Sequence, residues 1–145
     1  MTTDLLSGDH LAYPVLCLSH DTSIVVAACR EELERCNAYA FFRNRYFEDL
    51  LVLDATARQF KVVSSRPHPP LSGLSLWLTR VRNTKLAVRL ELKESAAASL
   101  DASKHQVTEW LDKDPEFWEA SRDLGEWKRL VNDSRTMHQL IALFT

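Results

Sequence analysis

Apolar and polar residues alternate along the first two-thirds of the chain in the way that predicts β-strands. In the clearest run, Leu86–Leu92, every second residue is Leu or Val and the residues between are Ala87, Arg89 and Glu91. A period of two is typical of a half-buried strand. Shorter apolar runs predict strands over 13–19 and 23–28, and a β-hairpin from 50–54 and 60–64, with Asp54 beginning its turn.

The segments between these strands are less uniform. The charged run after residue 29 favours a short helix from about Arg30 to Asn37, and a helix extending back over 23–28 is the rival to the second strand. The aromatic segment 38–47 leaves helix and irregular structure open, and 74–81 leaves strand and short helix open. Pro67–Pro70 predicts a loop, and residues 1–10 a loose terminus.

From about residue 95 the apolar residues recur with a helical period. Ser99 or Asp101 can cap a helix that runs to about Lys113, and Asp114 followed by Pro115 is a good helix start. Asn132 and Asp133 interrupt the next apolar stripe, and we expect Ser134 to cap a last helix. The stripe of that helix consists of Met137, Leu140, Ile141 and Phe144.

Strands followed by helices predict the α+β class rather than an alternating α/β fold. We expect an antiparallel sheet from residues 13–92, with helices from about 99 to 144 packed on one of its faces. A length of 145 residues fits a single domain, 1–145, which can bury a core without a metal or a disulfide.

Cofactor, metal and membrane signatures are missing from the sequence. Cys17, Cys29 and Cys36 form no Cys-x-x-Cys pair, and the five histidines form no His-x-x-x-His pair. The three glycines, at positions 8, 73 and 125, are too far apart to form a phosphate-binding or dinucleotide-binding loop. No leader peptide is apparent, and no apolar run approaches the roughly 20 residues that cross a bilayer. We expect no cofactor, no metal, no membrane and a reducing cytoplasm.

A nucleophilic active site would have to be built from His20, Asp21 and Cys36. Neighbouring residues in a strand point to opposite faces, so His20 and Asp21 fit a polar turn better than a base with its carboxylate. No catalytic signature surrounds Cys36, and a cysteine nucleophile needs a base beside it. We therefore expect a protein without catalysis, and an uncharacterised enzyme built from these residues is the rival hypothesis.

The net charge of −2 is distributed unevenly along the chain. Residues 1–40 sum to −4, residues 41–93 to +6 and residues 94–145 to −4. Basic and aromatic residues together are how proteins hold single-stranded nucleic acid, so the segment 41–93 is an alternative binding face for nucleic acid. Its central residues are Arg43, Arg45, Arg80 and Arg82. The isoelectric point of about 6.2 and the lack of a nucleic-acid motif argue against this alternative.

Tryptophan and acidic residues gather in the last third of the chain. Trp110, Trp118 and Trp127 lie within eighteen residues of one another. Aromatic residues at helical spacing belong more often to a core, but Trp is also frequent at the centre of protein interfaces. We expect a protein-binding surface here, for a cationic partner or inside a homodimer. Its residues are Trp118, Glu116, Glu119 and Asp123.

A family resemblance adds weight to binding. Tyr13–Leu16, Asp21, Glu32-Leu33, Cys36, Tyr46-Phe47, Leu51–Asp54 and Phe60–Val62 together resemble small bacterial cytoplasmic proteins of unassigned role. More loosely, they resemble the immunity proteins encoded beside polymorphic toxins. The resemblance covers residues 13–63 and assigns no functional residue. It implies a non-enzymatic protein that binds and blocks a partner, such as a toxin.

Overall fold

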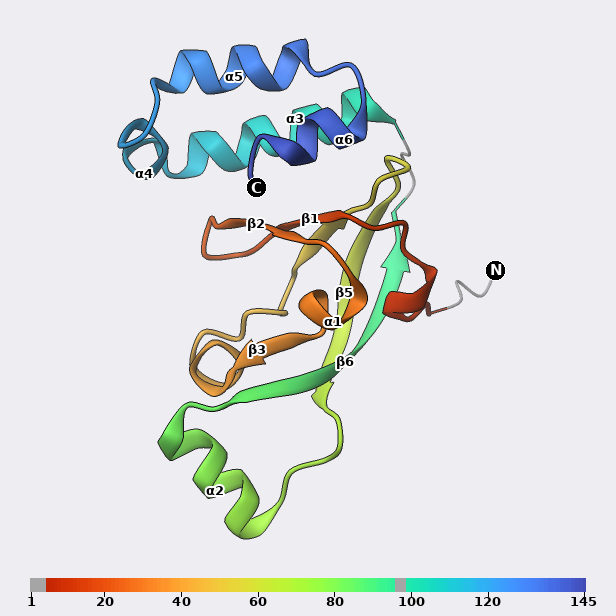
Figure 1. Cartoon of the computed structure of the whole chain (residues 1–145), viewed down its shortest axis with the longest axis vertical. Helices are drawn as coiled ribbons and strands as arrows, with labels where there is room; N and C mark the ends of the chain where they lie inside the picture. Colours follow the sequence, from red (N-terminus) through yellow and green to blue (C-terminus); the bar gives the residue numbers. More distant parts are fainter. Residues whose placement is uncertain (1–4, 96–98) are drawn as a thin grey trace.

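The computed structural model describes residues 5–95 and 99–145. Figure 1 shows a curled sheet with a layer of helices over one end. The sheet has six strands in the order β2-β1-β4-β5-β6-β3, and every neighbouring pair is antiparallel. The strands are β1 (Val15–Leu18), β2 (Ile24–Ala27), β3 (Arg35–Asn37), β4 (Leu51–Leu53), β5 (Gln59–Pro67) and β6 (Lys85–Glu94).

In the described residues, four α-helices follow the last strand and two connect successive strands. The four are α3 (Leu100–Lys113), α4 (Pro115–Glu119), α5 (Leu124–Asp133) and α6 (Met137–Ala142). The short α1 (Arg30–Leu33) joins β2 to β3, and α2 (Gly73–Arg82) joins β5 to β6. A 3-10 helix η1 (Gly8–His10) precedes β1, and a π-helix η2 (Tyr39–Arg43) follows β3. None of the described helices is long and apolar enough to cross a membrane.

Alternate residues of the strands point to opposite faces of the sheet and pack in two separate cores. Leu16 and Leu18 of β1 pack with Val107, Leu111 and other residues of α3–α6 in what we call the helical core. Val15 and Cys17 of the same strand face the other way, into an inner core that the curl of the sheet encloses. The predicted α+β class is confirmed, with the helices on one face of the sheet.

The strongest sequence signals are confirmed. Leu86, Val88, Leu90 and Leu92 of β6 are all buried, as the period of two predicts. β4 and β5 form the predicted hairpin, and the Asp54 carboxylate accepts hydrogen bonds from the backbone of Thr56 and Arg58. Ser99 caps α3 through the amide of Ala102.

The predicted helix over 30–37 is correct only for its first turn. After Leu33 the chain enters β3, where Cys36 pairs with Leu86 of β6. The carboxylate of Glu34 is buried and accepts a hydrogen bond from the amide of Leu90, at 2.9 Å. Pairing with the edge of β6 thus overrides the local helix propensity, as tertiary contacts often do.

Three further differences lie near element ends. Residues 5–10 are attached to the sheet by a bridge between Leu6 and Leu92, whereas the pattern predicts a loose terminus; residues 1–4 lie outside the described part. Thr136, and not Ser134, caps α6 through the amide of Gln139, at 3.1 Å. Asn132 and Asp133 remain inside α5 because the helix continues two residues past Val131, the end of its apolar stripe.

Candidate functional site

The helix α2 sits at the tip of the β5–β6 hairpin, at the end of the molecule opposite the helical layer (Figure 1). None of its residues is buried. For residues 74–81 the sequence pattern does not decide between a strand and a short helix. The segment forms a helix, which is capped at both ends. The amide of Ser72 donates to the Ser75 hydroxyl, and Asn83 ends the helix in the left-handed conformation, with φ 49°.

Three large apolar side chains of α2 point into solvent. Leu74 is 70% exposed, Trp77 58% and Val81 63%. They are spaced i, i+3 and i+7 and so share one side of the helix. Tyr39 of η2, close by, is 54% exposed. Half of the large hydrophobic residues that the described chain exposes are therefore on α2 and η2. Exposed apolar patches of this kind are typical of interaction surfaces.

Contacts between η2 and α2 join the two elements into one surface. The Arg80 guanidinium lies over the ring of Phe42, 5.3 Å from its centroid. The amide of Tyr39 donates to the side-chain oxygen of Asn83 at 2.7 Å. A cavity of about 400 Å³ lies between the two elements and is also lined by Arg43 and Val81. Rare π-helices such as η2 occur frequently at functional sites.

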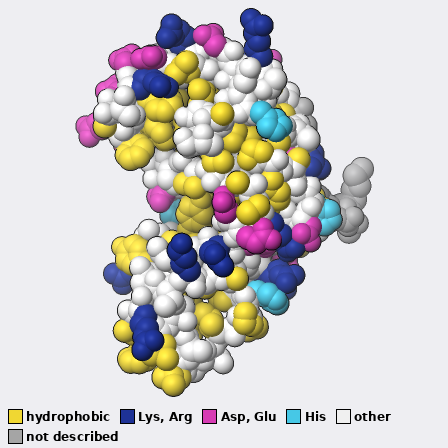
Figure 2. Space-filling view, viewed as in Figure 1, with side chains coloured by type: hydrophobic (Ala, Val, Ile, Leu, Met, Phe, Trp, Pro, Cys, Tyr) yellow, Lys and Arg dark blue, Asp and Glu magenta, His cyan; other side chains and the backbone are white. Residues whose placement is uncertain are grey.

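The charge of this region is entirely positive. We define the α2 lobe as residues 35–47 and 64–90, which include β3, η2, α2 and the adjoining parts of β5 and β6. It contains no acidic residue and eight basic ones: Arg35, Arg43, Arg45, Arg66, Arg80, Arg82, Lys85 and Arg89. Only Arg45 forms an ion pair with a described residue, Glu48, at 3.7 Å. Figure 2 shows blue and yellow side chains, without magenta, over the lower end of this face.

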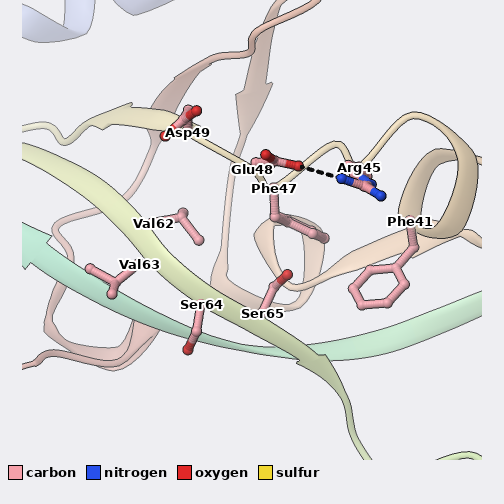
Figure 3. A pocket seen from close by; sticks show the side chains of 9 residues that line it. All are labelled: Phe41, Arg45, Phe47, Glu48, Asp49, Val62, Val63, Ser64 and Ser65. Carbon is pink, nitrogen blue, oxygen red and sulfur yellow. Dashed lines mark ion pairs between the residues drawn. The ribbon is translucent and has the colours of Figure 1, made fainter.

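The structure brings only some of the predicted nucleic-acid residues together. Arg43 and Arg80 line the same cavity, and Arg82 is exposed at the end of α2. Arg45 lies across η2 and lines a different cavity, of about 450 Å³, beside β5. Figure 3 shows the pair of Arg45 and Glu48 at this second cavity, with Ser64 and Ser65 contributed by β5. Arg45 is already paired with Glu48 there, Asp49 with Lys61, and the Ser64 hydroxyl donates to Glu91, so the α2 lobe is the stronger candidate.

The predicted surface near the end of the chain is divided between core and solvent. Trp118 is only 7% exposed and packs edge-on against Trp127 and Phe144 in the helical core. Glu116, Glu119 and Asp123 are exposed, and Asp123 caps α5 through the amide of Gly125. The aromatic side chain that reaches solvent is Phe117, which is 63% exposed.

His20, Asp21 and Cys36 do not converge on one another. His20 Nε2 is 2.7 Å from the carbonyl of Asn44, and Asp21 accepts hydrogen bonds from Ser19 and Ser23. Burial opposes ionisation of Asp21, but these hydrogen bonds outweigh it and lower its pKa. Burial raises the pKa of the Cys36 thiol to about 11, which disfavours the nucleophilic thiolate. In residues 5–95 and 99–145, no group of three or more His, Cys, Asp or Glu side chains is placed to hold a metal.

The distribution of acidic residues along the sequence could have indicated the α2 lobe, although the net charge of the whole chain does not. No Asp or Glu occurs between Asp54 and Glu91, a stretch that holds seven basic residues. The exposure of Leu74 and Val81 is not readable from sequence, because the same residues on a packed helix would be core.

Comparison with models of protein families, with curated proteins and with solved structures found no match to this chain. Its function is therefore argued from its own residues.

Proposed function

We propose that this chain is a protein-binding domain that docks α2 onto an apolar groove with an acidic rim on another protein. The observation that supports it is the exposed stripe of Leu74, Trp77 and Val81 on a helix with no buried residue. An amphipathic helix laid into a groove is a recurring mode of recognition, with anchors at i, i+3 and i+7.

The energetics of the α2 lobe favour binding. Burying a side chain such as Leu or Val contributes about 1.5–3 kcal/mol, so the three anchors can offset much of the cost of association. Trp and Arg are the residue types that most often dominate interfaces, and α2 carries Trp77, Arg80 and Arg82 together. Unpaired basic groups around the stripe select an acidic partner and accelerate its association.

Blocking of the partner is the form of binding that the family resemblance supports. An immunity-like protein needs a complementary surface and no catalytic group, and the proposal assigns no catalysis to this chain. A toxin is the partner class in this version of the proposal. We further propose a cytoplasmic location, which the free thiols of Cys17, Cys29 and Cys36 support.

Nucleic acid is the second candidate ligand, and the observation that favours it is the acid-free α2 lobe with eight basic residues beside Tyr39, Phe42 and Trp77. Phosphate binding would make affinity fall steeply with salt, with a slope set by the number of phosphates neutralised. An apolar protein interface depends on salt much less, because its affinity comes from buried area.

Photo-crosslinking from α2 tests the proposal. Benzoylphenylalanine at position 74 or 81, in cells of the source organism, is expected to form an adduct with one protein. The same residue at position 25 is the control, because Val25 is 45% exposed on β2, outside the α2 lobe. Trp77→Ala is expected to remove the adduct, and the identified protein should bind the purified chain at high salt. No adduct from α2, or an adduct that nuclease digestion releases, would refute the protein-binding proposal.

A further inference from the structure

A surface complementary to the α2 lobe lies at the opposite end of the same chain. Phe117, Trp118, Trp127, Leu143 and Phe144 line a cavity of about 500 Å³, which we call the aromatic groove. Trp127 and Phe144 are stacked, with ring centroids 5.5 Å apart. The rings form a firm apolar wall, and Phe117 extends from its edge into solvent. A cavity of this size and lining suits an aromatic anchor.

The edge of the aromatic groove carries uncompensated negative charge. Glu116 and Glu119 lie on either side of Phe117 along α4, and both are exposed. Neither takes part in an ion pair with any residue of the described chain. The basic neighbour at the groove is Arg122, whose guanidinium lies over the Trp127 ring at 4.8 Å. Arg122 contributes one positive charge against the two carboxylates of α4, so the edge keeps a net negative charge.

We propose that the groove which receives α2 is the aromatic groove of a second copy of this chain. Trp77 packs into the aromatic groove of the second copy, against its wall of rings, and Arg80 and Arg82 lie beside Glu116 and Glu119. This inference rests on the proposed function, since it names the partner of the same helix. It also gives the acidic surface around Trp118 a role, with Trp118 in the wall of the groove rather than as the inserted side chain.

The geometry makes this contact head-to-tail. α2 and the helical layer lie at opposite ends of the long axis of the molecule, so the two surfaces of one molecule cannot meet (Figure 1). Joining two different surfaces leaves one helix and one groove free on every dimer. Assembly then continues into open chains or closes into a ring, unlike a two-fold dimer.

Mixing two defective variants tests the inference. The first, Trp77→Ala with Arg80→Glu, removes the helix surface. The second, Glu116→Lys with Glu119→Lys, removes the groove edge. Sedimentation velocity should show each variant as a monomer and the wild-type protein growing in mass with concentration. Assembly should weaken only modestly between about 50 and about 500 mM salt, because buried apolar area supplies most of the affinity. A head-to-tail contact predicts that an equal mixture of the two variants forms a mixed dimer and nothing larger, at concentrations up to about tenfold above those at which the wild type assembles. A mixture that stays monomeric would mean that either pair of substitutions alone blocks both surfaces.

The mixed dimer forms because the intact groove of the first variant receives the intact α2 of the second. Arg129→Glu and Glu109→Lys are matched controls, since both side chains are exposed outside the two surfaces, and both should assemble like wild type. A monomeric wild-type protein, or two variants that assemble unchanged, would overturn the inference. If α2 still crosslinks to a different protein, the proposed function survives with that partner; if it crosslinks to none, both fail.

Discussion

The carboxylate of Asp54 holds the turn between β4 and β5 in place through several hydrogen bonds and an ion pair. It is fully buried and accepts hydrogen bonds from the amides of Ala12, Thr56 and Arg58. The Arg58 guanidinium pairs with it at 2.8 Å. Asp54 therefore ties the turn to the segment before β1, and its charge is compensated at short range.

Replacing Asp54 with Ala is expected to lower the free energy of unfolding by about 2–4 kcal/mol, because several buried donors lose their acceptor together. Urea unfolding followed by circular dichroism measures the loss. Asp112→Ala is the control, since Asp112 is 49% exposed and pairs with Lys128 on the surface. That change should cost less than about 1 kcal/mol. Equal losses in the two variants would contradict the role given to Asp54.

Hydrogen bonds between a side chain and the backbone of nearby residues can be predicted from the sequence, whereas hydrogen bonds between residues far apart in the chain cannot. Asp54 is predicted to begin a turn because Asp bonds to the backbone of nearby residues. Glu34 reads as part of a charged helix, yet its carboxylate receives the amide of Leu90, 56 residues further on. Only the pairing of β3 with β6 brings those two residues together.

At the scale of elements, α2 and α4 show how context decides the role of a tryptophan. Trp77 lies on a helix with no buried residue, whereas Trp118 contacts two further rings in the helical core. Sequence pattern alone cannot separate them, since both stand among apolar and charged neighbours. Residues 74–81 also fit both a period of two and a helical period, and caps at Ser72 and Asn83 decided between them.

We expect replacement by Ala to cost much more stability at Trp118 than at Trp77. Trp118→Ala should lower the free energy of unfolding by about 3–5 kcal/mol, because it leaves a cavity in the helical core. Trp77→Ala should cost less than about 1 kcal/mol, since the side chain is 58% exposed. Thermal unfolding of both variants measures the difference. A large loss for Trp77→Ala would mean that α2 is packed and would remove the basis for docking.

At the scale of the whole molecule, the curl of the sheet places two cysteine thiols and two tyrosine phenols in and around the inner core. Burial raises the pKa of Cys17 to about 12 and that of Cys36 to about 11. Burial also raises the pKa of Tyr46, and that of Tyr13, where the nearby Glu34 adds to the effect. These groups stay protonated in the folded chain at pH values where the unfolded chain releases their protons.

Stability is therefore expected to fall as the pH rises above about 9. The folded protein binds more protons than the unfolded protein between the ordinary thiol pKa of 9.0 and the raised values, so the free energy of unfolding decreases with pH across that window. Below it these groups have no effect. Urea unfolding at pH 7, 9 and 10.5 measures the slope (about 1.4 kcal/mol per proton and pH unit at most). Cys36→Ala should reduce the slope, and an unchanged slope would contradict the assignment.

The order of strands and helices, the cleanest strand and the segregation of charge could all be predicted from the sequence. The sequence could not predict that the basic and acidic surfaces lie at opposite ends of the molecule, because their positions depend on how β5 and β6 place α2 far from the helical layer. For the same reason, the sequence locates the acidic surface near Trp118 but not the burial of its ring.

The attachment of α2 to the hairpin has a consequence for how this chain can change. The amide of His68 bonds to the carbonyl of Ala87, so the two strands are still paired where the chain leaves them for the helix. Closing a loop between paired ends depends only weakly on its length. α2 is thus an insert between two adjacent points of the completed β5–β6 ladder. We expect that its sequence can drift, lengthen or be exchanged for another segment while the two cores keep their packing, so the surface that α2 presents can change without a change of fold.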